Sequence, residues 1–157
     1  MSKFKSAIVD AFDKLPTYYI EIGVISSNAS RKDKVRMGVT NAEIMFLHEK
    51  GSPMRHIPAR PVLQMTIDYA NKHLIKSTMQ KAIRAYIDSG FDEKKVELEL
   101  NKLCIKMQNY ARNIIYSNDG RLAPNSPSVA AKKKGNHPLF DTGQLARSIT
   151  CQLVIER

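Results

Sequence analysis

The side chains that could support metal binding or acid–base chemistry are scattered along this chain of 157 residues. Metal sites and acid–base pairs usually show as ligands or carboxylates closely spaced on one element. His48 lies beside Glu49 at an expected helix end, but no second histidine follows four residues later, so the HExxH arrangement of zinc proteases is missing. The remaining histidines form no close pair: His56, His73 and His137. We therefore expect no metal site and no catalytic residue.

Motifs for nucleophilic catalysis and phosphate binding are missing as well. The chain has no GxSxG, no P-loop and no GxGxxG, and its nearest glycine turn, DTGQL from Asp141 to Leu145, is more typical of a helix cap. We expect neither an enzyme nor a cofactor, and no small-molecule substrate. A small hydrolase or nuclease would need a site assembled from distant residues, and that alternative stays open.

The two cysteines, Cys104 and Cys151, lie in an expected helix and an expected strand, without the spacing of metal ligands. Free cysteine is among the most buried residue types. We expect two buried thiols and no disulfide.

The net charge of +10 is concentrated in three segments, residues 26–36, 50–60 and 121–147, which carry +3, +3 and +4. Each of them is an expected loop or short connecting element. Clustered positive charge suits an anionic partner, either nucleic acid or an acidic protein surface, although solvated loops would have the same composition. The candidate residues facing a partner or DNA are Arg31, Lys32, Lys34, Arg36, Lys50, Arg55, Lys132, Lys133 and Lys134.

Nucleic-acid binding is thus one hypothesis for this chain, as a basic DNA-binding or packaging accessory protein. The frames of sequence-reading modules, such as helix-turn-helix or zinc fingers, are missing. Any contact with DNA is therefore expected at phosphates and not at bases.

Length and composition indicate one folded domain, residues 1–157, with enough apolar residues (43%) for a core. No run of about 18 apolar residues exists that could span a membrane, and the first twelve residues lack the apolar region of a signal peptide. We expect a protein made in the cytoplasm that does not associate with membranes.

The first half of the chain begins with apolar residues at helical spacing in residues 1–14, and Pro16 ends this expected helix. Alternation predicts a strand over residues 17–25 and a second, antiparallel strand over residues 35–39. Thr40 begins a capping box, which predicts a short helix ending near Gly51.

A long helix is expected from Pro61, where the missing N–H has no intrahelical partner, to about Gly90. A second long helix, capped by Asp92, follows after a few residues, so the two predict an antiparallel hairpin. Beyond it we expect a short basic helix from Ser126 and Pro127, and a single turn capped by Asp141 and Gln144.

A last strand places Ile149, Cys151, Leu153 and Ile155 on one face. Together these elements predict an α+β fold. A small antiparallel sheet of about three strands would pack against the long antiparallel helical hairpin, with short extra helices.

Two segments carry a resemblance to a known family. Residues 40–63, TNAEIMFLHEKGSPMRHIPARPVL, resemble the xAxxHExG...IPxRPFL core of tail-completion, neck or virion-morphogenesis proteins of tailed phages. Residues 122–150, LAPNSPSVAAKKKGNHPLFDTGQLARSIT, are similar to the LxPLSPxTxxxKG...PLxDTGxLxxSI end of the same proteins, among them the G protein of Mu-like phages. The matching motif residues are His48, Glu49, Gly51, Pro58, Arg60, Pro61, Asp141, Thr142 and Gly143.

The resemblance implies a structural protein of the virion that completes the tail and joins it to the head. It implies a ring of identical subunits, a hexamer in most such proteins, in contact with the head–tail connector, with tail terminator or tube proteins, and with DNA in the channel. By their residue types, the motif residues are expected to shape the fold, with Arg60 reaching an acidic group or a helix end. The polar loops at residues 26–34 and 52–57 are the expected interfaces.

Overall fold

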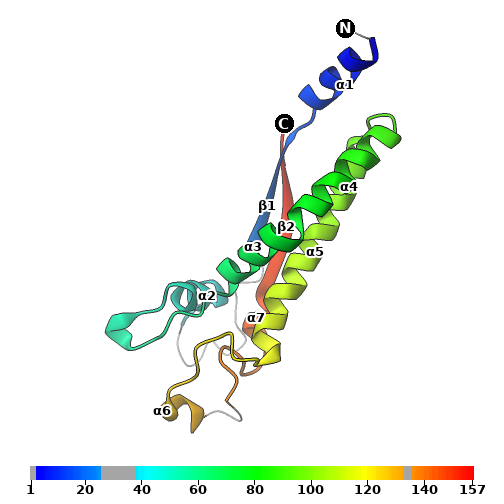
Figure 1. Ribbon diagram of the computed structural model, residues 1–157. Coiled ribbons are helices and arrows are strands. Elements are labelled where there is room, and N and C mark those ends of the chain that lie inside the picture. The colour runs from blue at the N-terminus through cyan, green and yellow to red at the C-terminus, as the bar shows by residue number, and fades with distance from the viewer. Residues whose placement is uncertain (1–2, 26–37, 133–135) are drawn as a thin grey trace.

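The computed structural model describes residues 3–25, 38–132 and 136–157, with side chains from Ile8 onward. It is a mixed fold of helices and a small antiparallel sheet, drawn out along one axis (Figure 1). The elements follow in the order α1 (Lys3–Asp13), β1 (Thr17–Val24), α2 (Asn41–Lys50), the 3-10 helix η2 (Pro53–Arg55), α3 (Val62–His73), α4 (Ile75–Asp88), α5 (Glu93–Ser117), α6 (Pro127–Ala130), α7 (Gln144–Ser148) and β2 (Ile149–Glu156).

The sheet pairs the first strand with the last one in the sequence. β1 and β2 are antiparallel, with Ile20 opposite Leu153 and Ile22 opposite Cys151. These four side chains pack toward the helices, as their alternation predicts, so both strand predictions and the choice of buried face are confirmed.

The third strand expected over residues 35–39 falls mostly on residues 26–37, outside the described residues. The two described positions at its end, Gly38 and Val39, are not in a strand. In the described part of the chain the sheet therefore has two strands instead of three.

Helix α5 is the element against which most others pack. Asp92 caps its start by accepting a hydrogen bond from the backbone N–H of Lys94 (3.0 Å), as predicted. The strand β2 lies along it, held by Gln108, whose Oε1 accepts from the N–H of Cys151, and by Arg112, which donates to the carbonyl of Ile149 (2.8 Å). Side chains of α5 therefore bond the backbone N–H of Cys151 and the backbone carbonyl of Ile149 in β2.

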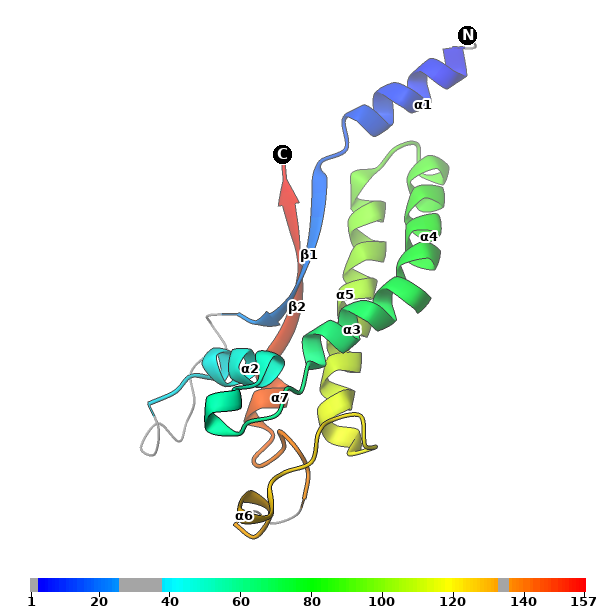
Figure 2. The ribbon, with the colours of Figure 1, turned by 60° about the vertical axis from the view of Figure 1, so that its left-hand side comes forward.

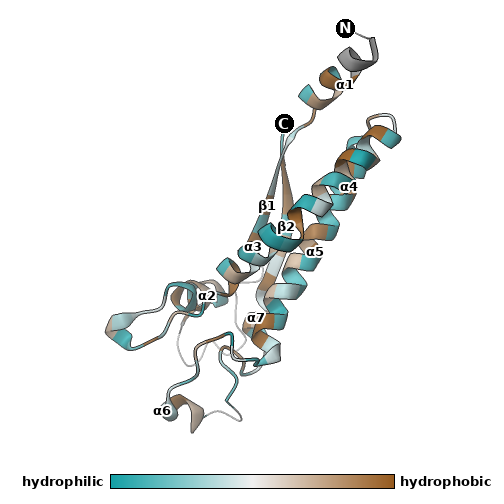
Figure 3. Cartoon of the chain, viewed as in Figure 1, coloured by the Kyte–Doolittle hydropathy of each residue, from teal (hydrophilic) through white to brown (hydrophobic). Residues whose placement is uncertain are grey.

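Three apolar clusters follow one another along α5. One lies beside α2 and α7, the next beside α3, and the third at the far end beside α4 and α1. Figure 3 shows apolar stretches recurring along α5 and β2, which face each other, and on α4. Because the buried side chains are spread along a 25-residue helix, the molecule has two separate ends instead of one central core.

The single long helix predicted from Pro61 to about Gly90 is wrong as a continuous helix. It begins one residue later, at Val62, and is interrupted at Leu74 (φ −115°, ψ −45°), so that α3 and α4 form a bend (Figure 2). The buried residues recur every fourth position: Val62, Thr66 and Ala70 in α3, then Thr78, Ala82 and Tyr86 in α4.

This spacing explains the bend. An α-helix has about 3.6 residues per turn, so a stripe with a spacing of four rotates by about 40° at each step. In a straight helix, the positions of this stripe near Tyr86 would therefore no longer face α5. The break at Leu74 keeps both halves packed on α5, and the helical hairpin is formed by α4 and α5.

The outer end of the hairpin holds the last turn of α1. Tyr86, only 3% exposed, donates its hydroxyl to the carbonyl of Ala11 (2.8 Å), and its ring packs edge-on against Phe12 and Phe91. Burial raises the pKa of Tyr86, so the hydroxyl keeps its proton and remains a donor. In the described residues, no helix is both long and apolar enough to cross a membrane.

We predict opposite consequences for removing two buried tyrosine hydroxyls. The Tyr86 hydroxyl has a partner, whereas that of Tyr18 is buried with no hydrogen-bond partner among the described residues. Tyr86→Phe should lower the free energy of unfolding by about 1 kcal/mol, whereas Tyr18→Phe should leave it unchanged or raise it. Urea denaturation of the two variants and the wild type measures this, and equal losses would contradict the assignment.

Candidate assembly surface

The first motif segment, residues 40–63, contains α2, which ends abruptly at Gly51. Thr40 caps the helix through a capping box, its hydroxyl accepting from the N–H of Glu43 while the Glu43 carboxylate accepts from the N–H of Thr40 (2.7 Å). These hydrogen bonds lower the pKa of Glu43. The helix ends at Gly51, as predicted, where φ is +71° and a Cβ would lie 2.8 Å from the backbone nitrogen of Ala59.

Glu49 caps a different helix from the one that carries it. Its carboxylate accepts from the backbone N–H groups of Leu63 (3.0 Å) and Gln64 (2.8 Å) at the start of α3. Pro61, the residue before α3, has no side chain that can make these bonds. A carboxylate at this position also suits the positive end of the helix dipole. Glu49 therefore fixes the start of α3 relative to the end of α2.

Arg60 joins the two motif segments. It is 5% exposed, and its guanidinium donates to the carbonyls of Ala123 (2.7 Å) and Pro124 (2.8 Å). Nη1 also lies 3.2 Å from Nδ1 of His48 and Nη2 lies 3.5 Å from Oδ1 of Asn125. Burial lowers the pKa of Arg60, yet an arginine stays charged at neutral pH.

The acidic partner expected for Arg60 is not found among the described residues. Of the two predicted partners, the helix end is reached, because His48 lies in the last turn of α2, and backbone carbonyls of the loop after α5 take the place of the acidic group. A guanidinium directs several N–H groups in a fixed fork, so one side chain can hold two successive carbonyls. This geometry fixes the loop that begins the second motif segment.

Residues 52–57 form a hydrogen-bonded turn, which we call the finger. Its base is a two-residue bridge, in which Ser52 and Ile57 exchange backbone hydrogen bonds of 2.8 and 2.9 Å. At its tip η2 is closed by His56 in the left-handed region (φ 52°). Met54 is 95% exposed there. The loop expected as an interface is thus a structured tip that presents an apolar side chain to solvent.

The second motif segment starts from a compact turn. Asp119 accepts from Arg121 at 2.8 Å, and this pairing lowers the pKa of Asp119. The Arg121 guanidinium lies 5.6 Å from the ring centre of Tyr110, which stacks on Tyr69 at 3.9 Å. The following loop carries α6, close to its predicted start at Ser126, and residues 133–135 of the predicted basic helix lie outside the described residues.

The DTG turn leads into α7, and its predicted side-chain cap by Asp141 is wrong. Gly143 occupies the cap position with φ +74° and no side chain, and Arg147 bonds instead to the carbonyl of Thr142 (2.9 Å). The turn does aim Leu145 into the core as expected, next to α2. Both motif segments therefore meet in the apolar cluster at one end of α5.

The basic residues proposed to face a partner are only partly described. Lys50, Arg55 and Lys132 are exposed, and their segments lie at the same end of the molecule in Figures 1 and 2. The others lie outside the described residues: Arg31, Lys32, Lys34, Arg36, Lys133 and Lys134. Within the described part of the chain, no three His, Cys, Asp or Glu side chains gather in a way that could hold a metal.

The structure also brings together the two cysteines, which lie 47 positions apart in the sequence. Both are free thiols, as predicted, but only Cys104 on α5 is fully buried, whereas Cys151 on β2 is half-buried. The interaction between the two thiols lowers the pKa of Cys104 and raises that of Cys151. Only the pairing of β2 with α5 reveals this contact.

In comparisons with known proteins, no family model, curated sequence or solved structure matches this chain. The motif residues and the geometry of the surface that they form are therefore the evidence on what this chain does.

We predict that Arg60→Met destabilises the protein by about 2–4 kcal/mol, because two carbonyls lose the charged donor of a buried side chain. Arg55→Met removes the same charge from the exposed finger and should change stability by less than about 0.5 kcal/mol. Urea unfolding gives both values, and trypsin cleavage after Arg121 should become faster in the Arg60 variant alone. Equal stability of the two variants would contradict the joining role of Arg60.

Gly51 and Gly90 share a φ of +71° but differ in their surroundings. The positive φ should cost either Gly→Ala variant at least about 1 kcal/mol. Gly51→Ala should lose at least about 2 kcal/mol more, because its Cβ meets backbone atoms of residues 57 and 59, whereas nothing lies within 4 Å at Gly90. Chemical denaturation curves measure the difference, and equal losses would show that residues 57–59 move away freely.

Proposed function

We propose that this chain is a non-enzymatic structural protein of a tailed bacteriophage, located in the neck or at the head-proximal end of the tail. There it completes the tail and joins it to the head connector. The two motif segments that resemble the tail-completion and neck proteins are the source of this proposal.

The observation that carries the proposal is the contact between these segments. Arg60 of the first segment binds Ala123 and Pro124 of the second across more than 60 residues of sequence. Two motifs that were recognised separately therefore form one structural unit. This supports a common role for them in shaping one end of the molecule.

The surface at that end suits contact with other proteins. The finger presents Met54, 95% exposed, beside Arg55 on a backbone held by the Ser52–Ile57 bridge. Methionine and arginine are both enriched at the centre of protein interfaces, so an exposed methionine beside an arginine is typical of a protein contact. We propose that the finger contacts the connector or the tail terminator and tube proteins.

The elongated shape is also suited to a ring subunit. Because the apolar clusters follow α5 in a row, each subunit has a finger end and a hairpin end (Figure 1). Neighbours in a ring contact each other through two different patches, and an elongated subunit keeps such patches apart. We propose rings of six subunits in the virion.

DNA binding remains the second candidate, because the exposed Lys50, Arg55 and Lys132 lie at one end of the molecule. Repeated around a ring, these side chains would give a positive surface toward DNA in the channel. This alternative requires a free subunit with measurable affinity for duplex DNA.

We predict that the purified protein forms an oligomer whose mass rises with concentration and does not change on addition of short duplex DNA. Light scattering at two salt concentrations, with and without DNA, measures this. A permanent monomer with tight, strongly salt-dependent DNA binding would overturn the proposal in favour of the alternative.

Charge-reversal variants make the comparison sharper. Arg55→Glu with Lys132→Glu should abolish DNA binding if the alternative holds, while Lys95→Glu, an equally exposed change on α5, should have little effect. Under the proposed function, neither change alters the affinity for DNA by more than about two-fold.

A further inference from the structure

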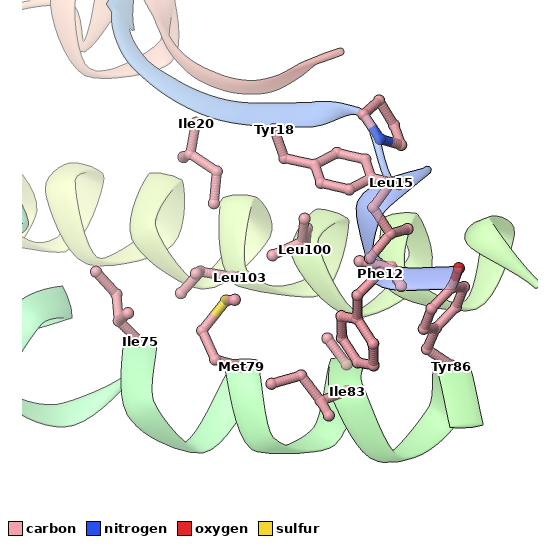
Figure 4. Close-up of a pocket in the computed structure, with 13 residues that line it drawn as sticks. Phe12, Leu15, Tyr18, Ile20, Ile75, Met79, Ile83, Tyr86, Leu100 and Leu103 are labelled. Carbon is pink, nitrogen blue, oxygen red and sulfur yellow. The ribbon is translucent and has the colours of Figure 1, made fainter. Parts of the chain in front are cut away.

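An apolar groove lies at the hairpin end, away from both motif segments. Its walls are β1 and α4 and its floor is α5, as Figure 4 shows, and its volume is about 540 Å³. The lining is almost wholly apolar, with Tyr18 and Ile20 from β1, Ile75, Met79 and Ile83 from α4, and Leu100 from α5. The groove contributes to none of the contacts described above for Arg60 or the finger.

Large apolar side chains are exposed along α4, which forms one wall of the groove. Ile75, Met79 and Ile83 line the groove at every fourth position and are 37%, 43% and 42% exposed, and Ile87, 39% exposed, continues the row beyond it. Contiguous apolar surface of this kind marks a binding site more often than isolated exposed residues do. Burying these side chains would stabilise a complex, since each removes apolar area from water.

Helix α1 is an amphipathic helix with little packing of its own. Among the described residues, its contact with the body comes from its last turn, where Ala11 and Phe12 meet Tyr86. Upstream of this turn the helix projects beyond the hairpin, as Figures 1 and 2 both show. Ile8 on the projecting part is only partly buried.

The dimensions of α1 and of the groove agree. At 1.5 Å per residue, the eleven residues of α1 span roughly 16 Å, and the groove wall from Ile75 to Tyr86 spans about the same length. Charge does not contribute to this match, because Lys3 and Lys5 balance Asp10 and Asp13 within α1. The match therefore depends on length and on the apolar face of α1, where apolar residues recur at helical spacing.

Only the last turn of α1 reaches the groove of its own chain, where Phe12 lines the outer end. This turn is held there by the bond from the Tyr86 hydroxyl to Ala11 and by packing of Phe12 against Tyr86, and the helix runs away from the groove upstream of it. A second copy of the chain has the same projecting helix and can bring it in from outside.

We propose that the groove between β1 and α4 receives helix α1 of a second copy of this chain. The contact is heterologous, because a projecting helix meets a different surface on its neighbour, and repetition of such a contact closes into a ring or continues as a filament. This inference rests on the proposed self-assembly and names the surfaces that carry it.

Crosslinking between two different variants tests the contact directly. Ile8→Cys protein is mixed with a differently tagged Met79→Cys protein and treated with a short bismaleimide. We expect a crosslinked heterodimer in this mixture. Replacing either member by its control should lower the yield at least five-fold. The controls are Val9→Cys, about 100° around α1 from Ile8, and Ile105→Cys, 59% exposed on α5 outside the groove. The wild type measures the background from Cys104 and Cys151.

Solution mass provides the second readout. Met79→Lys should weaken self-association at least ten-fold, whereas Ile105→Lys, an equally polar change at a more exposed position, should not. Circular dichroism melting of both variants verifies that each is folded. Equal crosslinking in all pairs, or equal oligomers in both Lys variants, would overturn the groove contact and leave the proposed function standing.

The opposite failure is distinguishable. A wild-type chain that stays monomeric and binds DNA would remove the proposed function and this inference together. An Ile8–Met79 crosslink that forms within one doubly substituted chain, independently of concentration, would show that α1 folds back into its own groove, which also overturns the proposal.

Discussion

The buried guanidinium of Arg60 is the interaction on which the finger end of this protein depends. It has no carboxylate partner among the described residues and is held by backbone carbonyls of Ala123 and Pro124 and by His48. A charge removed from water in this way is tolerated only when its donors are paired. The chain must therefore bring the end of α2 and the loop after α5 to the same place, and this requirement orients both the finger and the second motif segment.

The rest of the architecture follows from the length of α5. Its 25 residues give space for α2, α3, α4 and the sheet to pack side by side along one helix. The apolar side chains therefore form successive clusters, and the ends of the molecule are free for different contacts. The bend at Leu74 belongs to this arrangement, because it allows a stripe with a spacing of four residues to follow α5.

The two ends differ in chemistry in a way that suits a subunit placed between unlike neighbours. At one end, hydrogen bonds hold a basic surface around the exposed Met54. At the other, an open apolar groove lies beside helix α1, whose contacts with the body, among the residues with described side chains, come from its last turn. The proposed contact between copies at the groove and the proposed contact with other proteins at the finger would not compete for the same surface.

The sequence by itself determined the features that depend on near neighbours. The capping box at Thr40, the stop at Gly51, the cap at Asp92 and the buried faces of β1 and β2 were all predictable, because each follows from residues a few positions apart. The tertiary structure alone decided that Glu49 caps α3, that Arg60 binds loop carbonyls, and that Cys104 meets Cys151. The physical reason is that these contacts join elements distant in sequence. A polar side chain can bond several kinds of group, and the packing of whole elements decides which of them lies within its reach.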